Sequence, residues 1–275
     1  MDKILEIAET RQAIQYLKVA SFVVFLHDYL VTLELEVTHI WKSNWSTIKV
    51  AFLVARYLPF VDVPLILTYS LYSGLTFRDC YIVTSAASWS SLVGVGAAEV
   101  ILLLRTYALW DRSKQLLIFL VLLFIGVFVV GGVSTEIFLR SIQYAPLPFP
   151  FMRGCFPIAA SKLLYVDFVV ALVDETVIML LTLYVGFKRY RHSRSRLVTV
   201  LYRDGVLYFM CLFMITFSYA VVLIASPPEY IDLLNTPHRV LHSILGARIV
   251  LQVREIAQKD RTTSAIIHRR GDTMS

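Results

Sequence analysis

Residues 116–133 (LLIFLVLLFIGVFVVGGV) decide the fold class, because no face of a helix built from them would carry a charged side chain. A helix on the surface of a water-soluble protein keeps a polar stripe, and this segment has none. Outward from it, the chain contains six mostly apolar stretches of about 20 residues, the length that crosses a bilayer, separated by short charged segments. We therefore predict an all-α fold, a polytopic transmembrane helical bundle.

The composition leaves no room for a sizeable soluble domain. Of the 275 residues, 57% are hydrophobic, and the mean hydropathy is +0.68. The apolar residues come in blocks, unlike the mixed pattern of a globular domain. The net charge of +6 is not concentrated in a nucleic-acid-binding module, so we predict no nucleic-acid partner. Residues 1–275 are interpreted as one integral membrane domain with the lipid bilayer as its first partner.

Seven spans are predicted, and the last of them is marginal. Six lie near residues 16–35, 50–72, 81–104, 114–138, 163–187 and 205–226, and the seventh covers 230–253. The seventh contains several charged residues and histidines, so it needs the other helices around it in order to insert. The distribution of Lys and Arg around the spans favours an N-terminus outside and a cytosolic C-terminus. Residues 255–275 are predicted to form a short disordered cytosolic tail.

A basic segment, residues 188–203 (KRYRHSRSRLVTVLYR), contributes most to this predicted orientation, because it contains six basic residues and no Asp or Glu. It is either a plain topology signal or a surface that binds anionic lipids or a cytosolic signalling protein. Arg105, at the inner end of the third predicted span, lies on the same side, where arginine commonly reaches lipid phosphates. The candidate cytosolic contact residues are Arg105, Lys188, Arg189, Arg191, Arg194 and Arg196.

The predicted topology brings two of the three cysteines to the outer side. Cys80 lies at the start of the third span, Cys155 lies in the long outer loop 139–162, and Cys211 lies inside the sixth span. A disulfide between Cys80 and Cys155 would pin the outer loop to the third span on the oxidising side of the membrane. Two free thiols are the alternative.

Several acidic residues fall inside predicted spans, where a charge costs roughly 2.5–3.5 kcal/mol at the centre of a helix. Asp167 and Asp174 are seven residues apart and share a helix face, while Asp62 lies between two prolines that predict a kink. Such acids either line an internal cavity for a ligand, ion or proton, or form a hydrogen-bond network that fixes helix register. The candidates for an intramembrane polar cavity are Asp28, Asp62, Glu99, Asp167 and Asp174.

No catalytic step is predicted. His238 and His242 are four residues apart, a spacing that can hold zinc on one helix face. With His27 and Asp28 they are similar to part of the pattern of seven-span zinc-dependent lipid hydrolases, whose wider motifs are missing. We therefore favour a helix-terminal polar face and predict no metal or other cofactor. The sequence also contains no nucleotide-binding glycine loop and no GxSxG elbow.

A set of residues spread along the chain carries a resemblance to a known family: Tyr29, Leu33, Glu36, Val37, Ile40, Trp41, Trp45, Ser46, Lys49, Phe52, Arg56, Tyr57, Pro59, Glu99, Leu104, Arg105, Tyr107, Ala108, Arg248, Ile249, Leu251, Arg254 and Glu255. In these residues the chain resembles a family of seven-span integral membrane proteins from mushroom-forming fungi (basidiomycetes), defined by an N-terminal domain of unknown function. The resemblance is strongest over residues 16–111 and continues more loosely to the last predicted span. It implies a fungal membrane protein whose biochemical role is unassigned.

Three functions fit these observations. The first is a receptor-like sensor, with an outer disulfide, a polar interior and a basic inner loop. The second is a proton- or cation-coupled transporter or channel that uses the intramembrane acids. The third is a metal-dependent membrane lipid hydrolase that uses the two histidines. The plasma membrane is the expected location, because the C-terminus carries no retention or lipidation motif.

Overall fold

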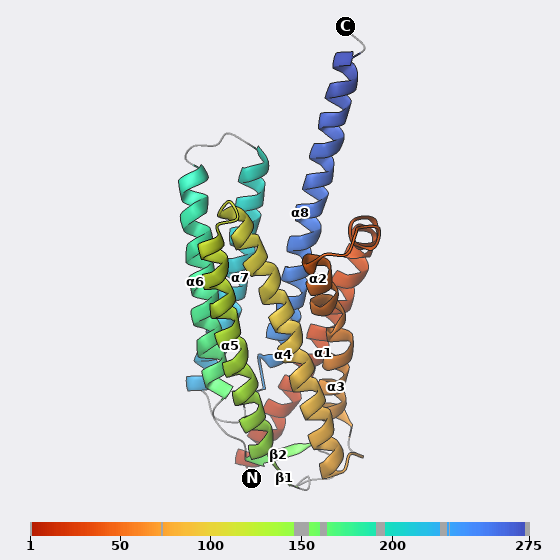
Figure 1. The fold of residues 1–275 in the computed structure, drawn as a ribbon. Helices are drawn as coiled ribbons and strands as arrows, with labels where there is room; N and C mark the ends of the chain where they lie inside the picture. The colour runs from red at the N-terminus through yellow and green to blue at the C-terminus, as the bar shows by residue number, and fades with distance from the viewer. Residues whose placement is uncertain are drawn as a thin grey trace.

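The structure, a computed structural model, describes residues 2–72, 74–145, 154–159, 164–190, 196–225, 230 and 232–272. The described chain is largely helical, and its long helices form one elongated bundle (Figure 1). The elements in chain order are α1 (Asp2–Glu36), the π-helical turn η1 (Val37–Trp41), α2 (Thr47–Tyr57), α3 (Pro59–Leu71), α4 (Phe77–Leu109), α5 (Lys114–Ser141), β1 (Gln143–Ala145), β2 (Phe156–Ala159), α6 (Leu164–Tyr190), α7 (Arg196–Ala225) and α8 (Asn235–Asp272).

Length and composition make this a multipass membrane bundle. Within the described residues, five helical segments are long and apolar enough to cross a membrane: Ala8–Trp41, Thr47–Leu71, Phe77–Leu109, Lys114–Ser141 and Val166–Lys188. A shorter apolar stretch, Leu207–Val222, lies in α7. The outward face of α5 exposes Ile118, Leu122, Ile125 and Val129, a continuous apolar surface that suits lipid. The first five predicted spans therefore coincide with apolar helices, while the sixth and seventh fall on α7 and α8.

The predicted kink near Asp62 is present as a break between two helices. α2 ends at Tyr57 and α3 begins at Pro59, with Leu58 between them. Proline lacks the amide hydrogen that would continue α2, but it is well placed in the first turn of α3. Pro64 lies inside α3, one turn further on. Asp62 lies in the first turn of α3, directly after this break, and its side chain is fully buried.

Two helices occupy the middle of the bundle. α4 contacts α2, α3, α5, α6 and α8. Its stripe of small residues, Ser90, Gly94 and Ala98 at four-residue spacing, lets neighbouring helices approach closely. α8 contacts α1, α2, α3, α4, α7 and η1, although its sequence is too polar to insert on its own. The shared apolar core is built from residues of six helices, including Phe52, Leu102, Leu120, Ile178, Leu212 and Leu251. The marginal seventh predicted span is thus a central element of the fold.

Beyond the bundle, α8 continues as a helix through Asp272 (Figure 1). The structure gives residues 255–272 a helical backbone, within the segment for which the sequence predicted a disordered tail. The segment contains good helix formers, namely alanine, glutamine, glutamate, lysine and arginine, and has no proline. Because these residues extend a helix that is already nucleated in the bundle, they avoid the cost of starting a new one.

A small β1–β2 hairpin covers the end of the bundle where the N-terminus lies (Figure 1). Its strands are antiparallel, and a disulfide joins Cys155 beside β2 to Cys80 in α4, with 5.9 Å between the Cα atoms. The Cys155 amide donates to the Tyr69 carbonyl oxygen at 2.9 Å, and Arg11 donates to the Cys155 carbonyl oxygen at 2.7 Å. The hairpin is therefore fastened to α1, α3 and α4.

Candidate functional site

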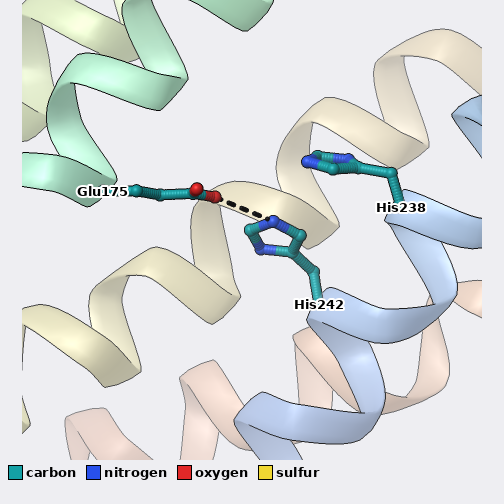
Figure 2. A group of neighbouring side chains, drawn as sticks. All are labelled: Glu175, His238 and His242. Carbon is teal, nitrogen blue, oxygen red and sulfur yellow. Dashed lines mark ion pairs between the residues drawn. The ribbon is translucent and has the colours of Figure 1, made fainter. Parts of the chain in front are cut away.

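The candidate site is a buried group of one acid and two histidines, Glu175, His238 and His242, here named the acid–histidine cluster. The histidines are one helical turn apart on α8, and Glu175 reaches toward them from α6 (Figure 2). One possible ligand atom from each residue lies within 4.8 Å of the others. Glu175 Oε1 is 3.2 Å from His242 Nε2, and the two imidazole ring centres are 4.4 Å apart. The spacing on α8 places both rings on one face, as the sequence indicated.

Polar groups of two further helices contact the cluster. The Thr216 hydroxyl of α7 lies 2.9 Å from Glu175 Oε1 and 3.0 Å from His238 Nε2. From α4, Glu99 Oε1 lies 3.6 Å from His242 Nδ1. His238 also packs against the rings of Phe168 and Tyr219, at centroid distances of 5.5 and 6.1 Å. Four helices therefore converge on the two imidazoles.

The cluster is not open to the bilayer surface. The exposed fractions of His238, His242 and Glu175 are 5%, 1% and 4%. The sequence favoured a helix-terminal polar face for the histidines, and the structure buries them because α4, α6 and α7 enclose the start of α8. Among the described residues, neither ring nitrogen of His242 makes a hydrogen bond, nor does Glu175 Oε2. Buried polar atoms without hydrogen bonds cost about 1–3 kcal/mol each, so their concentration here is unusual.

A second charged group, next to the cluster, pairs α8 with α3. Arg239 Nε and Nη2 each lie 2.9 Å from Asp62 Oδ2, and both side chains are at most 1% exposed. Gly94 of α4 makes room for the guanidinium group, since a Cβ atom there would lie 2.0 Å from Arg239 Nη2. The small-residue stripe of α4 thus admits a buried cation as well as a neighbouring helix.

A third charged group joins α1, α2 and α8. Arg56 donates to Glu36 at 2.5 Å and to the Thr32 hydroxyl at 2.6 Å, and it lies 3.7 Å from Asp28. Asp28 also accepts a hydrogen bond from Arg248 at 2.6 Å. The nearest carboxylate to Arg56 belongs to Glu36, which lies at the end of α1. Each of the four charged side chains in this group therefore has a partner of opposite charge.

The five predicted cavity acids are distributed among separate groups. Asp28 and Asp62 belong to the two ion-paired groups just described, and Glu99 contacts the acid–histidine cluster. Asp167 accepts a hydrogen bond from Ser134 of α5, and Asp174 is buried on α6. Sequence reasoning did not include Glu175 or Glu36 among the candidates. A signal for Glu175 was present, because an acid in an apolar span requires a partner and the two histidines required one as well.

Few of the predicted cytosolic contact residues can be placed. Arg105 is half-buried near the end of α4, and Lys188 is exposed near the end of α6. Arg191 and Arg194 lie outside the described residues. For Arg189 and Arg196 the structure describes the backbone at the ends of α6 and α7, but not the side chain.

A comparison with known protein families gives a match over the part of the chain that contains the third charged group. Residues 16–61 match the model of a family of unknown function, DUF6533. The match runs from α1 through η1 and α2 into the start of α3, and it contains Asp28, Glu36 and Arg56. No curated protein matches the chain. The matched segment therefore includes the α1–α2 ion pairs, while the acid–histidine cluster lies outside it.

Proposed function

We propose that this protein is a seven-span, receptor-like sensor with its N-terminus outside the cell and its C-terminus in the cytosol. The observation that carries the proposal is the row of polar contacts along α8. Arg239 pairs with α3, and His242 approaches α4 and α6. Further along, Arg248 pairs with Asp28 of α1, and Arg254 donates to the His39 carbonyl oxygen at 2.8 Å. A shift of α8 would change contacts with five partner elements together: α1, η1, α3, α4 and α6.

α8 also offers a route from the interior to the cytosolic side. The helix passes these contacts and continues beyond the bundle at the end opposite the N-terminus (Figure 1). Ion pairs between helices can exchange between discrete arrangements. A helical bundle that switches between two conformations requires contacts of this kind. Under this proposal, a stimulus on the outer side changes the preferred position of α8. The part of α8 that extends beyond the bundle then changes its contact with a cytosolic partner. The basic segment 188–203 supplies a second contact for that partner or for anionic lipid.

The arrangement of the ends supports the orientation. The N-terminus and the β1–β2 hairpin lie at one end, and the C-terminus lies at the other, as an odd number of spans requires (Figure 1). A disulfide belongs on the oxidising side, which favours the hairpin end as the outer one. The end of α6 and the start of α7, whose sequences are rich in basic residues, lie at the C-terminal end, where positive charge favours the cytosol (Figure 1). The resemblance to fungal seven-span proteins supports the same number of spans, and we propose the plasma membrane as the location.

The topology gives the first testable prediction. A reporter active only in the cytosol, fused to the C-terminus, is expected to be active. The exposed sequon Asn44-Trp45-Ser46, in the turn after η1, is expected to remain unglycosylated. A sequon introduced into the β1–β2 hairpin serves as the matched positive control. An inactive reporter together with unmodified Asn44 would mean an even number of spans and would exclude the receptor-like arrangement.

The switching role of α8 gives the second prediction. Spin labels at Lys188→Cys and Ala257→Cys, in a Cys211→Ala background, report the distance between the inner ends of α6 and α8. Asp28→Asn removes the carboxylate that pairs with Arg248, so a second population of distances is expected relative to the parent. Glu136→Gln is the matched control, because its partner Arg140 forms an exposed pair within α5.

Identical single distance distributions in Asp28→Asn and its parent would contradict the sensor proposal. The same purified protein in liposomes tests the transporter alternative. Proton or cation flux that Asp62→Asn abolishes would identify a transporter instead.

A further inference from the structure

We propose that Glu175, His238 and His242 bind a divalent transition-metal ion of the zinc class. The proposal concerns the acid–histidine cluster alone and holds whether or not α8 acts as a switch. Imidazole nitrogen and carboxylate oxygen are zinc ligands, and a set of two histidines and one acid leaves a fourth position for water or another ligand.

The distances fit a metal site after small side-chain movements. Zinc binds these atoms at about 2.0–2.2 Å, so two ligand atoms in a tetrahedral site lie about 3.3 Å apart. Glu175 Oε1 and His242 Nε2 are already 3.2 Å apart without a hydrogen bond between them. All three possible ligand atoms lie within 4.8 Å of one another. Figure 2 shows that the carboxylate and both rings face the same region between α6 and α8.

The groups around the cluster have the arrangement expected of supporting residues. A metal-binding histidine usually donates its other ring N–H to a carboxylate, which fixes the ring and its tautomer. Glu99 Oε1 lies 3.6 Å from His242 Nδ1, while Nε2 of the same ring faces Glu175. Thr216 contacts both Glu175 and His238 and orients them toward one another. Glu99 and Thr216 are therefore positioning residues in this proposal.

The charges favour a cation. Glu99 and Glu175 approach one imidazole from opposite ring nitrogens in a buried region, so carboxyl oxygens, which are metal-ligand atoms, lie on both sides of the ring. Within the described part of the chain, no ion pair joins either acid to a lysine or arginine. Arg239 is adjacent to His238 in sequence, but its charge is matched by Asp62. A divalent ion at the cluster would bind Glu175 and His242 Nε2, and the opposite ring nitrogen of His242, Nδ1, would face Glu99.

The test uses the full chain in nanodiscs, in a Cys211→Ala background that removes the free thiol. After equilibration with zinc and removal of excess metal, roughly one zinc ion per chain is expected by elemental analysis. Cobalt substitution is expected to give the visible absorption of a tetrahedral nitrogen–oxygen site. His242→Gln and Glu175→Gln each remove a ligand and should weaken zinc binding by at least about 100-fold, whereas Glu99→Gln should weaken it about 10–100-fold. His27→Gln, an exposed histidine on α1, should bind as the parent does.

The outcomes are distinct. Substoichiometric zinc and no tetrahedral cobalt spectrum in the parent protein would overturn the proposal, whatever the variants do. Equal affinity in the parent and His242→Gln would also overturn it. Folding of each variant is checked by size exclusion and by the Cys80–Cys155 disulfide, and zinc should raise the melting temperature of the parent but not of the ligand variants. None of these results depends on the orientation of the chain.

Discussion

Replacing Gly94 with alanine is expected to lower the free energy of unfolding by about 3–5 kcal/mol, the cost of separating a buried ion pair. The new methyl group would lie 2.0 Å from Arg239 Nη2, so the guanidinium group must move. It has little freedom to do so, because Arg239 and Asp62 are both buried between α3, α4 and α8. Displacing Arg239 leaves Asp62 charged, buried and unpaired. The midpoint of unfolding in mixed micelles of increasing SDS content measures the loss.

Gly126→Ala is the matched control for Gly94→Ala. Gly126 lies in α5, and a Cβ atom there would have no neighbour within 4 Å. Alanine favours a helix over glycine by about 1 kcal/mol, so this variant should be unchanged or slightly more stable. Asp62→Asn in the Gly94→Ala background provides a further check. It should cost less than in the parent, since the pair is already broken. Equal stability of Gly94→Ala and Gly126→Ala would mean that the Arg239–Asp62 pair contributes nothing.

The positions of the helices could be predicted from the sequence, because hydropathy depends on each segment alone. The apolar blocks of the sequence predicted the first five spans. The prolines on either side of Asp62 predicted the break between α2 and α3. The central position of α8 could not be predicted in this way. Its charges are stable only because acids of α1, α3 and α6 pair with them, and those acids are far away in sequence. Arg239 and Asp62 are 177 residues apart.

The candidate site was only partly predictable for the same reason. Helical periodicity placed His238 and His242 on one face, and it identified Glu99 as a polar residue inside a span. It could not show which helix faces the histidines, since that depends on the order and rotation of the helices. Glu175 therefore appeared as one of several acids in its span. In the structure, Glu175 is the acid of α6 that faces the histidines of α8. Asp167 of the same helix instead contacts Ser134 of α5.

Removing the disulfide, in a Cys80→Ala/Cys155→Ala double variant, is expected to cost about 2–4 kcal/mol of unfolding free energy. The cross-link closes a loop with a sequence separation of 75 residues, which restricts the unfolded chain. In the folded protein the cross-link also anchors the β1–β2 hairpin to α4. The hairpin's other contacts include two hydrogen bonds at Cys155. They also include the Tyr144 hydroxyl, which lies 3.1 Å from Thr84 Oγ1. The same SDS titration measures the loss.

Reductant separates the disulfide from any other effect of the two substitutions. It should lower the stability of the parent to that of the double variant and leave the double variant unchanged. Cys211→Ala is the matched control, because this exposed cysteine of α7 lies outside the cross-link and its removal should stay within about 0.5 kcal/mol. Alkylation followed by mass spectrometry reports whether the bond forms in cells. Free thiols at Cys80 and Cys155 would place the hairpin on the reducing side of the membrane, and both the stabilisation and the proposed orientation would then be wrong.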